Sequence, residues 1–229
     1  MKNNYFFLSI AIIISAAILG FCVVLATTPK ASVLVRGLAQ REVSADLGIW
    51  RISYGAGSNS LLDLQKEIKE KNEIIKEYLL SFGLENNDFN VLAATINDTS
   101  LDIYSNKENI KFTYLGTVNF IIRTNKIKEL NEAYKNAINL ASKNIAIKQD
   151  FENKITYEFT KLNEIKPEMI EEATISARAA AQKFAKDSGS EVGKIKNATQ
   201  GLFSIENAAG GLEERKNIRV VTQVEYYLK

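Results

Sequence analysis

The sequence predicts an α+β protein in which three long helices pack on antiparallel β-sheet, preceded by one N-terminal helix of transmembrane length. Three observations lead to this prediction. A charge-free run fills residues 6–26, apolar residues recur at three- and four-residue steps in three later segments, and alternating segments rich in β-branched and aromatic residues lie between them. Strands and helices are therefore mixed along one globular chain.

The charge-free run from Phe6 to Ala26 is 21 residues long and follows a short head that carries Lys2. At about 1.5 Å per residue, a helix of this length crosses the hydrocarbon core of a bilayer. A small-residue pattern ending at Ala26 also fits a signal-peptidase site, so an uncleaved anchor and a cleaved signal peptide both remain open. We expect residues 1–30 to be a signal anchor or signal peptide and residues 31–229 to be the exported domain.

The charge balance argues against a nucleic-acid partner. The net charge is +2, and basic residues are interleaved with acidic ones instead of forming a patch. Residues 66–77 show this best, because opposite charges there are spaced four residues apart, as ion pairs on one helix require. These pairs are Lys66 with Glu70, Glu67 with Lys71, and Lys69 with Glu73. We therefore predict a solvated helix face and no binding of nucleic acid.

Histidine is absent from the sequence, and the only cysteine, Cys22, lies inside the apolar N-terminal run. Metal sites built on His or Cys, Ser-His-Asp and Cys-His nucleophiles, and a disulfide in the folded domain are therefore excluded. We expect no metal site, no cofactor and no catalytic residue, and predict that the chain is not an enzyme. Chemistry carried out by carboxylates alone would survive this exclusion.

The first strands are predicted at residues 31–36 and 41–54, on either side of a turn at Gly37. Alternation in the second segment predicts a strand that is buried on one face, with a denser apolar stretch near Trp50. Asp46 interrupts this strand with a charge. Because charged side chains are seldom buried without a partner, we expect Asp46 to be exposed on a strand or in a turn.

A helix is predicted over residues 61–82. Ser60 and Asp63 form a capping-box pattern at its start, and Gly83 follows its end. One face carries apolar residues at helical spacing, and covering a sheet is the usual role of such a face. These residues are Leu61, Leu64, Ile68, Ile75, Leu79 and Phe82.

The rest of the chain alternates between the two patterns. Segments rich in β-branched and aromatic residues predict a hairpin, a single strand and a closing hairpin around Gly210 and Gly211, and helical spacing predicts one more helix. The ranges are 89–103 with 108–124 for the first hairpin, 125–145 for the helix, 155–159 for the strand, and 194–205 with 217–228 for the closing hairpin. The regular last strand predicts either a sheet interior or an edge that pairs with another chain.

The clearest helix pattern begins at Pro167 and ends before Gly189. Pro167 suits a first helical residue, since proline has a preset φ and lacks an N–H that the helix could not use there, and Gly189 suits a left-handed C-cap. The predicted buried stripe is mainly alanine, which lets the helix axis come close to a sheet. Its residues are Met169, Ala173, Ala177, Ala180 and Phe184, widened by Ala181 and Ala185.

Three blocks carry a resemblance to a family. They read VLVRGLAQREVSADLGIW at residues 33–50, IKPEMIEEATISARAAAQKFAKDSGSEVGKIKNATQGLFSIE at residues 165–206, and VVTQVEYYL at residues 220–228. In this order they resemble the SIMPL-domain family, in particular its YggE-like periplasmic group, over about residues 31–229. The resemblance implies an α+β fold, export to the envelope, ring- or channel-like oligomers and a link to envelope and oxidative stress. The family has no established catalytic residues, so none is carried over.

Our leading hypothesis is an exported, non-enzymatic assembly or interaction module that forms homo-oligomers. We expect it in the inner membrane as a single-pass protein with its domain in the periplasm, or free in the periplasm after cleavage near Ala26; its protein partner is unknown.

Two alternatives come from other function classes. One is a cell-wall or ligand-binding module, whose aromatic residues would be Trp50, Tyr54, Tyr226 and Tyr227. The other is a carboxylate-only hydrolase, for which Glu42, Asp46 and Glu158 are the candidates and which needs two of them held together in one cleft.

Overall fold

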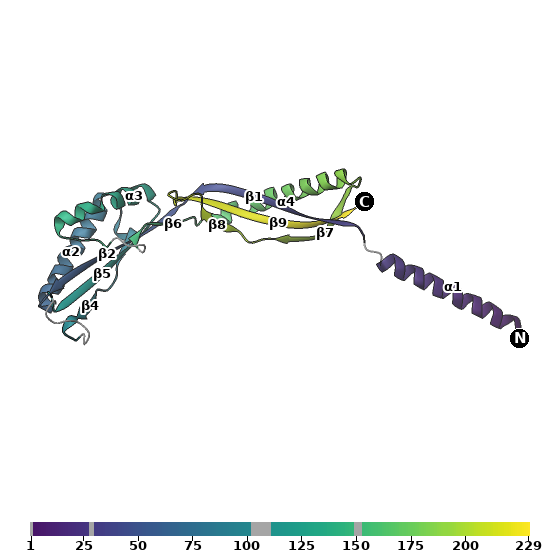
Figure 1. Cartoon of the computed structure of the whole chain (residues 1–229), viewed down its shortest axis with the longest axis horizontal. Helices are drawn as coiled ribbons and strands as arrows, with labels where there is room; N and C mark the ends of the chain where they lie inside the picture. Colours follow the sequence, from purple (N-terminus) through teal and green to yellow (C-terminus); the bar gives the residue numbers. More distant parts are fainter. Residues whose placement is uncertain (1, 28–29, 102–110, 149–152) are drawn as a thin grey trace. The chain divides into compact units, whose positions relative to one another are not determined.

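The computed structural model describes residues 2–27, 30–101, 111–148 and 153–229. Contacts divide the chain into two compact units, the first made of residues 1–39, 168–203 and 220–229 and the second of residues 40–167 and 204–219. In chain order (Figure 1), with 3₁₀ helices labelled η, the elements are α1 (Lys2–Thr27), β1 (Ser32–Ser44), β2 (Leu47–Ser58), α2 (Leu61–Ser81), η1 (Asn86–Asp88), β3 (Phe89–Val91), β4 (Thr95–Asp98), η2 (Thr99–Leu101), β5 (Tyr114–Thr124), α3 (Ile127–Lys135), η4 (Ala137–Lys143), β6 (Thr156–Glu158), α4 (Leu162–Asp187), β7 (Val192–Gln200), β8 (Ser204–Asn207) and β9 (Arg215–Leu228). The predicted mixed α+β class is confirmed.

The N-terminal run forms the helix α1, and its described side chains from Ile12 to Val23 are all exposed. The helical conformation predicted for this run is confirmed, while its passage through a membrane stays a prediction. Within the described residues, no helix qualifies as a membrane span by its length and apolar character.

A sheet with the strand order β1-β9-β7 organises the first unit, and β8 pairs with the opening residues of β9. Strand β9 lies in the interior of this sheet, which confirms one of the two places predicted for it. Its side chains alternate as predicted, because every second residue from Lys216 to Tyr226 is buried. The closing hairpin is also confirmed, with an interruption at residues 201–203 between β7 and β8.

Helix α4 lies along β1 and β9 and covers the buried face of these strands (Figure 1). Its buried residues follow a strict four-residue step: Met169, Ala173, Ala177, Ala181 and Ala185. Ala180 and Phe184, predicted as members of this stripe, are exposed instead. A stripe that advances by four residues turns only about 40° per step on a helix of 3.6 residues per turn, so neighbours one position away face solvent.

Gly37 lies inside β1, so the turn predicted there is wrong. The strand runs without a break from Ser32 to Ser44. Gly37 is not one of the positive-φ glycines of the described chain, and a Cβ on it would lie 1.9 Å from the carbonyl oxygen of Ala173 and 2.4 Å from the amide nitrogen of Ala177. The glycine therefore allows the backbone of β1 to pack directly against the backbone of α4. The alanine stripe on α4 was predicted to allow the same close approach from the helix side.

Pro167 is not the first residue of α4, because the helix begins at Leu162. This prediction is wrong by more than one turn. Proline inside a helix removes one main-chain hydrogen bond, here the bond that residue 167 would otherwise donate to the carbonyl of Asn163. Gly189, in contrast, has φ +69° after the helix end and confirms the predicted left-handed cap.

The second unit is built on a sheet with the strand order β3-β5-β2-β6, to which β4 adds by pairing with β5. Strands β2 and β5 form its centre and pair antiparallel from Gly48 with Thr124 to Ser58 with Tyr114. The predicted hairpin partner of β5 is divided into β3 and β4; residues 102–110, which include parts of both predicted strands, lie outside the described residues.

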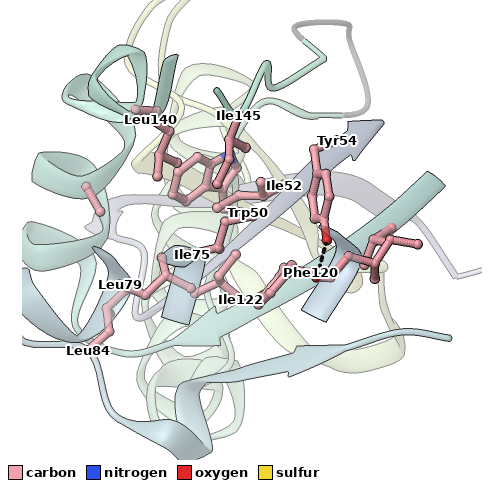
Figure 2. Packing of buried hydrophobic residues seen from close by; sticks show 14 of the residues in the cluster. Trp50, Ile52, Tyr54, Ile75, Leu79, Leu84, Phe120, Ile122, Leu140 and Ile145 are labelled. Carbon is pink, nitrogen blue, oxygen red and sulfur yellow. Dashed lines mark hydrogen bonds between the residues drawn. The ribbon is translucent and has the colours of Figure 1, made fainter. Parts of the chain in front are cut away.

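Helix α2 packs on this sheet and supplies Leu64, Ile68, Ile75 and Leu79 to the core. Figure 2 shows the buried side chains at the contact, which include Trp50, Ile52 and Tyr54 of β2, Phe120 and Ile122 of β5, and Ile75 and Leu79 of α2. The predicted cap is present, since the Ser60 side chain accepts a hydrogen bond from the Asp63 amide, and Gly83 has φ +88°. Of the predicted stripe, Leu61 is exposed and Phe82 is half-buried.

The helix predicted over residues 125–145 is divided at Asn136 into α3 and the 3₁₀ helix η4. The Asn136 side-chain amide donates to the carbonyl of Glu132, a local bond that competes with continuation of the α-helix. Leu130, Ala133, Ala137 and Leu140 reach the core, so buried side chains continue at three- and four-residue steps through both elements. Tyr134, Ile138 and Ala141, which helical spacing predicts on one side with Leu130, are exposed instead.

Candidate functional site

The three carboxylate residues proposed for a hydrolase each contact a different part of the chain. Asp46 is half-buried, and its two oxygens accept hydrogen bonds from the amide and hydroxyl of Thr160 at 2.8 and 3.1 Å. Glu42 forms an ion pair of 2.6 Å with Arg215. Glu158 is exposed on β6, where its main-chain carbonyl accepts from the amide of Asp46. Two of these carboxylates therefore hold the chain together, as caps and surface ion pairs do.

The aromatic residues proposed for a binding platform do not form an exposed surface. Trp50 and Tyr54 are buried in the core of the second unit, and Tyr226 is buried beneath α4 in the first unit. Only Tyr227 of the four is partly exposed. Because a sugar platform needs aromatic faces open to solvent, a cell-wall binding role for this set is wrong.

Lys71 departs from the predicted solvated face of α2. It does pair with Glu67 at 2.6 Å, as the spacing predicts, but its side chain is only 14% exposed. Its amine reaches the carbonyl of Gly55 on β2 at 3.4 Å and lies 6.0 Å from the centre of the Tyr54 ring. The lysine side chain therefore lies against β2, with its methylene groups largely buried and its amine bound to Glu67 and to the carbonyl of Gly55.

Tyr54 connects β2 to α2 next to Lys71. Its fully buried hydroxyl donates to the Asn72 side-chain oxygen at 2.7 Å and lies 3.2 Å from the carbonyl of Ile68. Burial, reinforced by the charge of Glu67, raises the pKa of the Tyr54 hydroxyl well above its ordinary value. Tyr54 therefore stays protonated and acts as a hydrogen-bond donor that ties β2 to α2.

A hollow of about 460 Å³ opens beside Lys71 in the second unit. Three glycines of the central strand pair contribute to it. The register places all three near one another, since Gly116 pairs with Ala56, the residue between Gly55 and Gly57. The full lining is Gly55, Ala56, Gly57, Glu67, Lys71, Phe112, Leu115, Gly116, Thr117 and Lys148. The sequence signal for this hollow is the pair of glycines Gly55 and Gly57 within one strand, which alternation of apolar residues does not reveal.

The outer strands of the first unit are a second candidate. In the described chain, β1 and β7 each pair with β9 and form the two edges of the sheet. Every residue of β7 after Gly193 is exposed. An edge strand presents main-chain N–H and C=O groups that can pair with another strand.

Lys216 is a buried amine that sequence reasoning missed, although the alternation of β9 extends to it. It is 8% exposed, and its Nζ donates to the side-chain oxygen of Asn207 at 2.5 Å. Burial lowers the pKa of the Lys216 amine, and the charges of Glu213 and Glu158 oppose this shift. No group of three His, Cys, Asp or Glu residues in the described ranges is placed to hold a metal ion.

The fold defines an α+β protein of two antiparallel sheets, each with a helix packed on one face. Residues 33–224 match the SIMPL family, which is described as a protein of unknown function (DUF541), and the chain belongs to this family. The resemblance of the three sequence blocks is thereby confirmed. Among curated proteins, no match to the chain was found.

Proposed function

We propose that this SIMPL-family chain is an exported, non-enzymatic module of the cell envelope that acts by assembling with copies of itself. The observation that carries the proposal is the pair of sheet edges, β1 and β7, left open in the described first unit. The family resemblance, with its oligomers and its link to envelope and oxidative stress, supports the same function and setting.

The two halves of β7 differ in how well they suit pairing with a second chain. The first half contains register shifts between Val192 and Asn197 and carries Lys194 and Lys196. Bulges and lysines are common protection against edge-to-edge contact. The second half, from Asn197 to Gln200, pairs with β9 in regular antiparallel register. We therefore assign subunit pairing to this regular half.

Antiparallel geometry identifies which main-chain groups of this half face outward. The amide of Gly201 donates to the carbonyl of Val221 at 2.8 Å, so residue 201 uses its main-chain groups toward β9. Because hydrogen-bonded residues alternate along an antiparallel pair, residues 199 and 197 also face β9, and Ala198 and Gln200 direct their N–H and C=O groups to the open edge. A proline at position 198 would therefore remove a hydrogen-bond donor from the open edge without removing a bond to β9.

Changing Ala198 to proline should therefore dissociate the assembly. Proline removes the outward N–H and leaves the bonds to β9 in place. We expect the full-length protein in detergent to have a multiple of the chain mass of 25.6 kDa by light scattering, and the Ala198→Pro variant to approach a single chain.

The matched control is Ala198→Thr, which keeps the N–H and suits a strand, and it should retain the mass of the parent protein. A parent protein that is a strict monomer at high concentration would rule out assembly. A proline variant with the parent's mass would rule out this edge as the interface.

For location, we propose a single-pass anchor in the inner membrane with the domain in the periplasm, on the strength of the charge-free run at residues 6–26. The protein isolated from its own cells should then stay with the membranes after a carbonate wash and keep residues 1–26. A soluble protein whose first residue lies near Thr27 would show cleavage instead and replace the anchor by a signal peptide.

A further inference from the structure

Gly55 is the one glycine of the hollow beside Lys71 that packing within the described chain does not explain. A Cβ on Gly116 would lie 2.9 Å from the end of Ile68, and a Cβ on Gly57 would lie 2.5 Å from the ring of Phe112. A Cβ on Gly55 would meet nothing closer than 3.9 Å, and Gly55 is not among the positive-φ glycines. Glycine inside a strand weakens it, and a common reason for its presence is the close approach of a ligand.

Positive charges outnumber negative ones in the lining of this hollow. Lys71 and Lys148 line it together with a single carboxylate, Glu67. Glu67 is already neutralised by Lys71 at 2.6 Å, while no described side chain forms an ion pair with Lys148. Two lysines and one carboxylate leave an excess of one positive charge in the lining, which favours a monoanion.

The main chain keeps Lys148 at this place. Its amide donates to the carbonyl of Ser53 at 2.8 Å, and the preceding Ile147 forms an isolated antiparallel bridge with Tyr54. The lysine is thus attached to β2 two residues before Gly55, on the strand edge that Lys71 reaches from α2. Phe112 and Leu115 add apolar surface to the same hollow.

We propose that this hollow binds a small organic monoanion, a carboxylate on an apolar or aromatic body. The carboxylate would lie at the amine of Lys148 beside Lys71, and the body would occupy the space above Gly55 against Phe112. The volume of about 460 Å³ falls within the range of small-molecule sites. This site is separate from the β7 edge, so it does not rest on the proposed assembly.

Fluorine NMR of the full-length protein in detergent tests the site with three probes of similar shape. These are 4-fluorophenylacetate, its neutral amide, and the cation 4-fluorobenzylamine. We expect protein-dependent line broadening for the carboxylate and at least about tenfold weaker binding of the other two, since a hydrogen bond to a charged group accounts for about one such factor.

Two variants locate the binding. Lys148→Gln should weaken carboxylate binding about tenfold, and Gly55→Leu should abolish it by filling the space, while its Cβ meets no atom closer than 3.9 Å. Lys143→Gln removes an exposed charge outside the hollow and should bind like the parent protein. Equal binding of carboxylate and amide, or carboxylate binding unchanged in both pocket variants, would overturn the proposal. Neither pocket variant should change the mass in solution, so failure here is distinguishable from failure of the assembly.

Discussion

Replacing Gly37 by alanine should lower the free energy of unfolding by about 3 kcal/mol, at the upper end of the usual cost of overpacking. The added Cβ would lie within 2.4 Å of main-chain atoms of Ala173 and Ala177. Backbone of a packed helix cannot rotate away as a flexible side chain can, so α4 must move off β1. The loss of contact would extend along the alanine stripe, because each of its side chains depends on the same short distance.

Two measurements on the full-length protein check this expectation. Urea unfolding followed by circular dichroism gives the overall change, and hydrogen exchange by mass spectrometry should show faster exchange in α4 and β9. Gly210→Ala is the matched control, since a Cβ there meets no atom within 4 Å and the residue does not have a positive φ. A Gly37 variant as stable as this control would show that the helix and strand are not in close contact.

Changing Leu64 to alanine should destabilise the second unit by about 2–5 kcal/mol, the usual cost of a cavity in a packed core. Leu64 is 0% exposed and belongs to the cluster that contains Trp50 and Phe120. Leu62, two residues earlier on α2, is 74% exposed, so Leu62→Ala should change stability by less than about 0.5 kcal/mol. The two variants remove the same atoms from opposite faces of one helix.

The single tryptophan of the sequence gives this comparison a local readout. Trp50 is buried in the second unit, so its fluorescence during urea unfolding reports on that unit. The midpoint should fall clearly for Leu64→Ala and stay with the parent for Leu62→Ala. Equal midpoints would mean that α2 does not cover the sheet through the face that carries Leu64.

Much of the fold could be predicted from local patterns. Alternation located β9, and the caps at Ser60, Gly83 and Gly189 marked three helix ends, because these signals depend on neighbouring residues alone. The turn predicted at Gly37 was wrong for the opposite reason. Gly37 is needed because helix α4 packs against it, and α4 lies more than a hundred residues later in the sequence. No local pattern shows such a contact.

The candidate site was harder to predict than the fold. Charge spacing predicted the pair of Glu67 and Lys71 correctly, yet it also predicted a solvated lysine, whereas Lys71 reaches back to Gly55. Aromatic residues suggested a binding platform, but their large apolar area places Trp50 and Tyr54 in the core. What a charge or ring faces is set by strand register and helix packing, and single-sequence patterns contain neither.

The pairing of β1 with β9 sets an order of events during biosynthesis. β1 ends at Ser44 and its sheet partner in the described chain begins at Arg215, so this ladder cannot form until Arg215 and the residues after it have been made. Strands β2 and β5, in contrast, need only the residues up to Thr124. Closing the longer loop has the higher entropic barrier, and we therefore expect the first unit to fold after the second. Until β9 is available, β1 lacks its sheet partner, and unpaired strand edges of this kind favour aggregation.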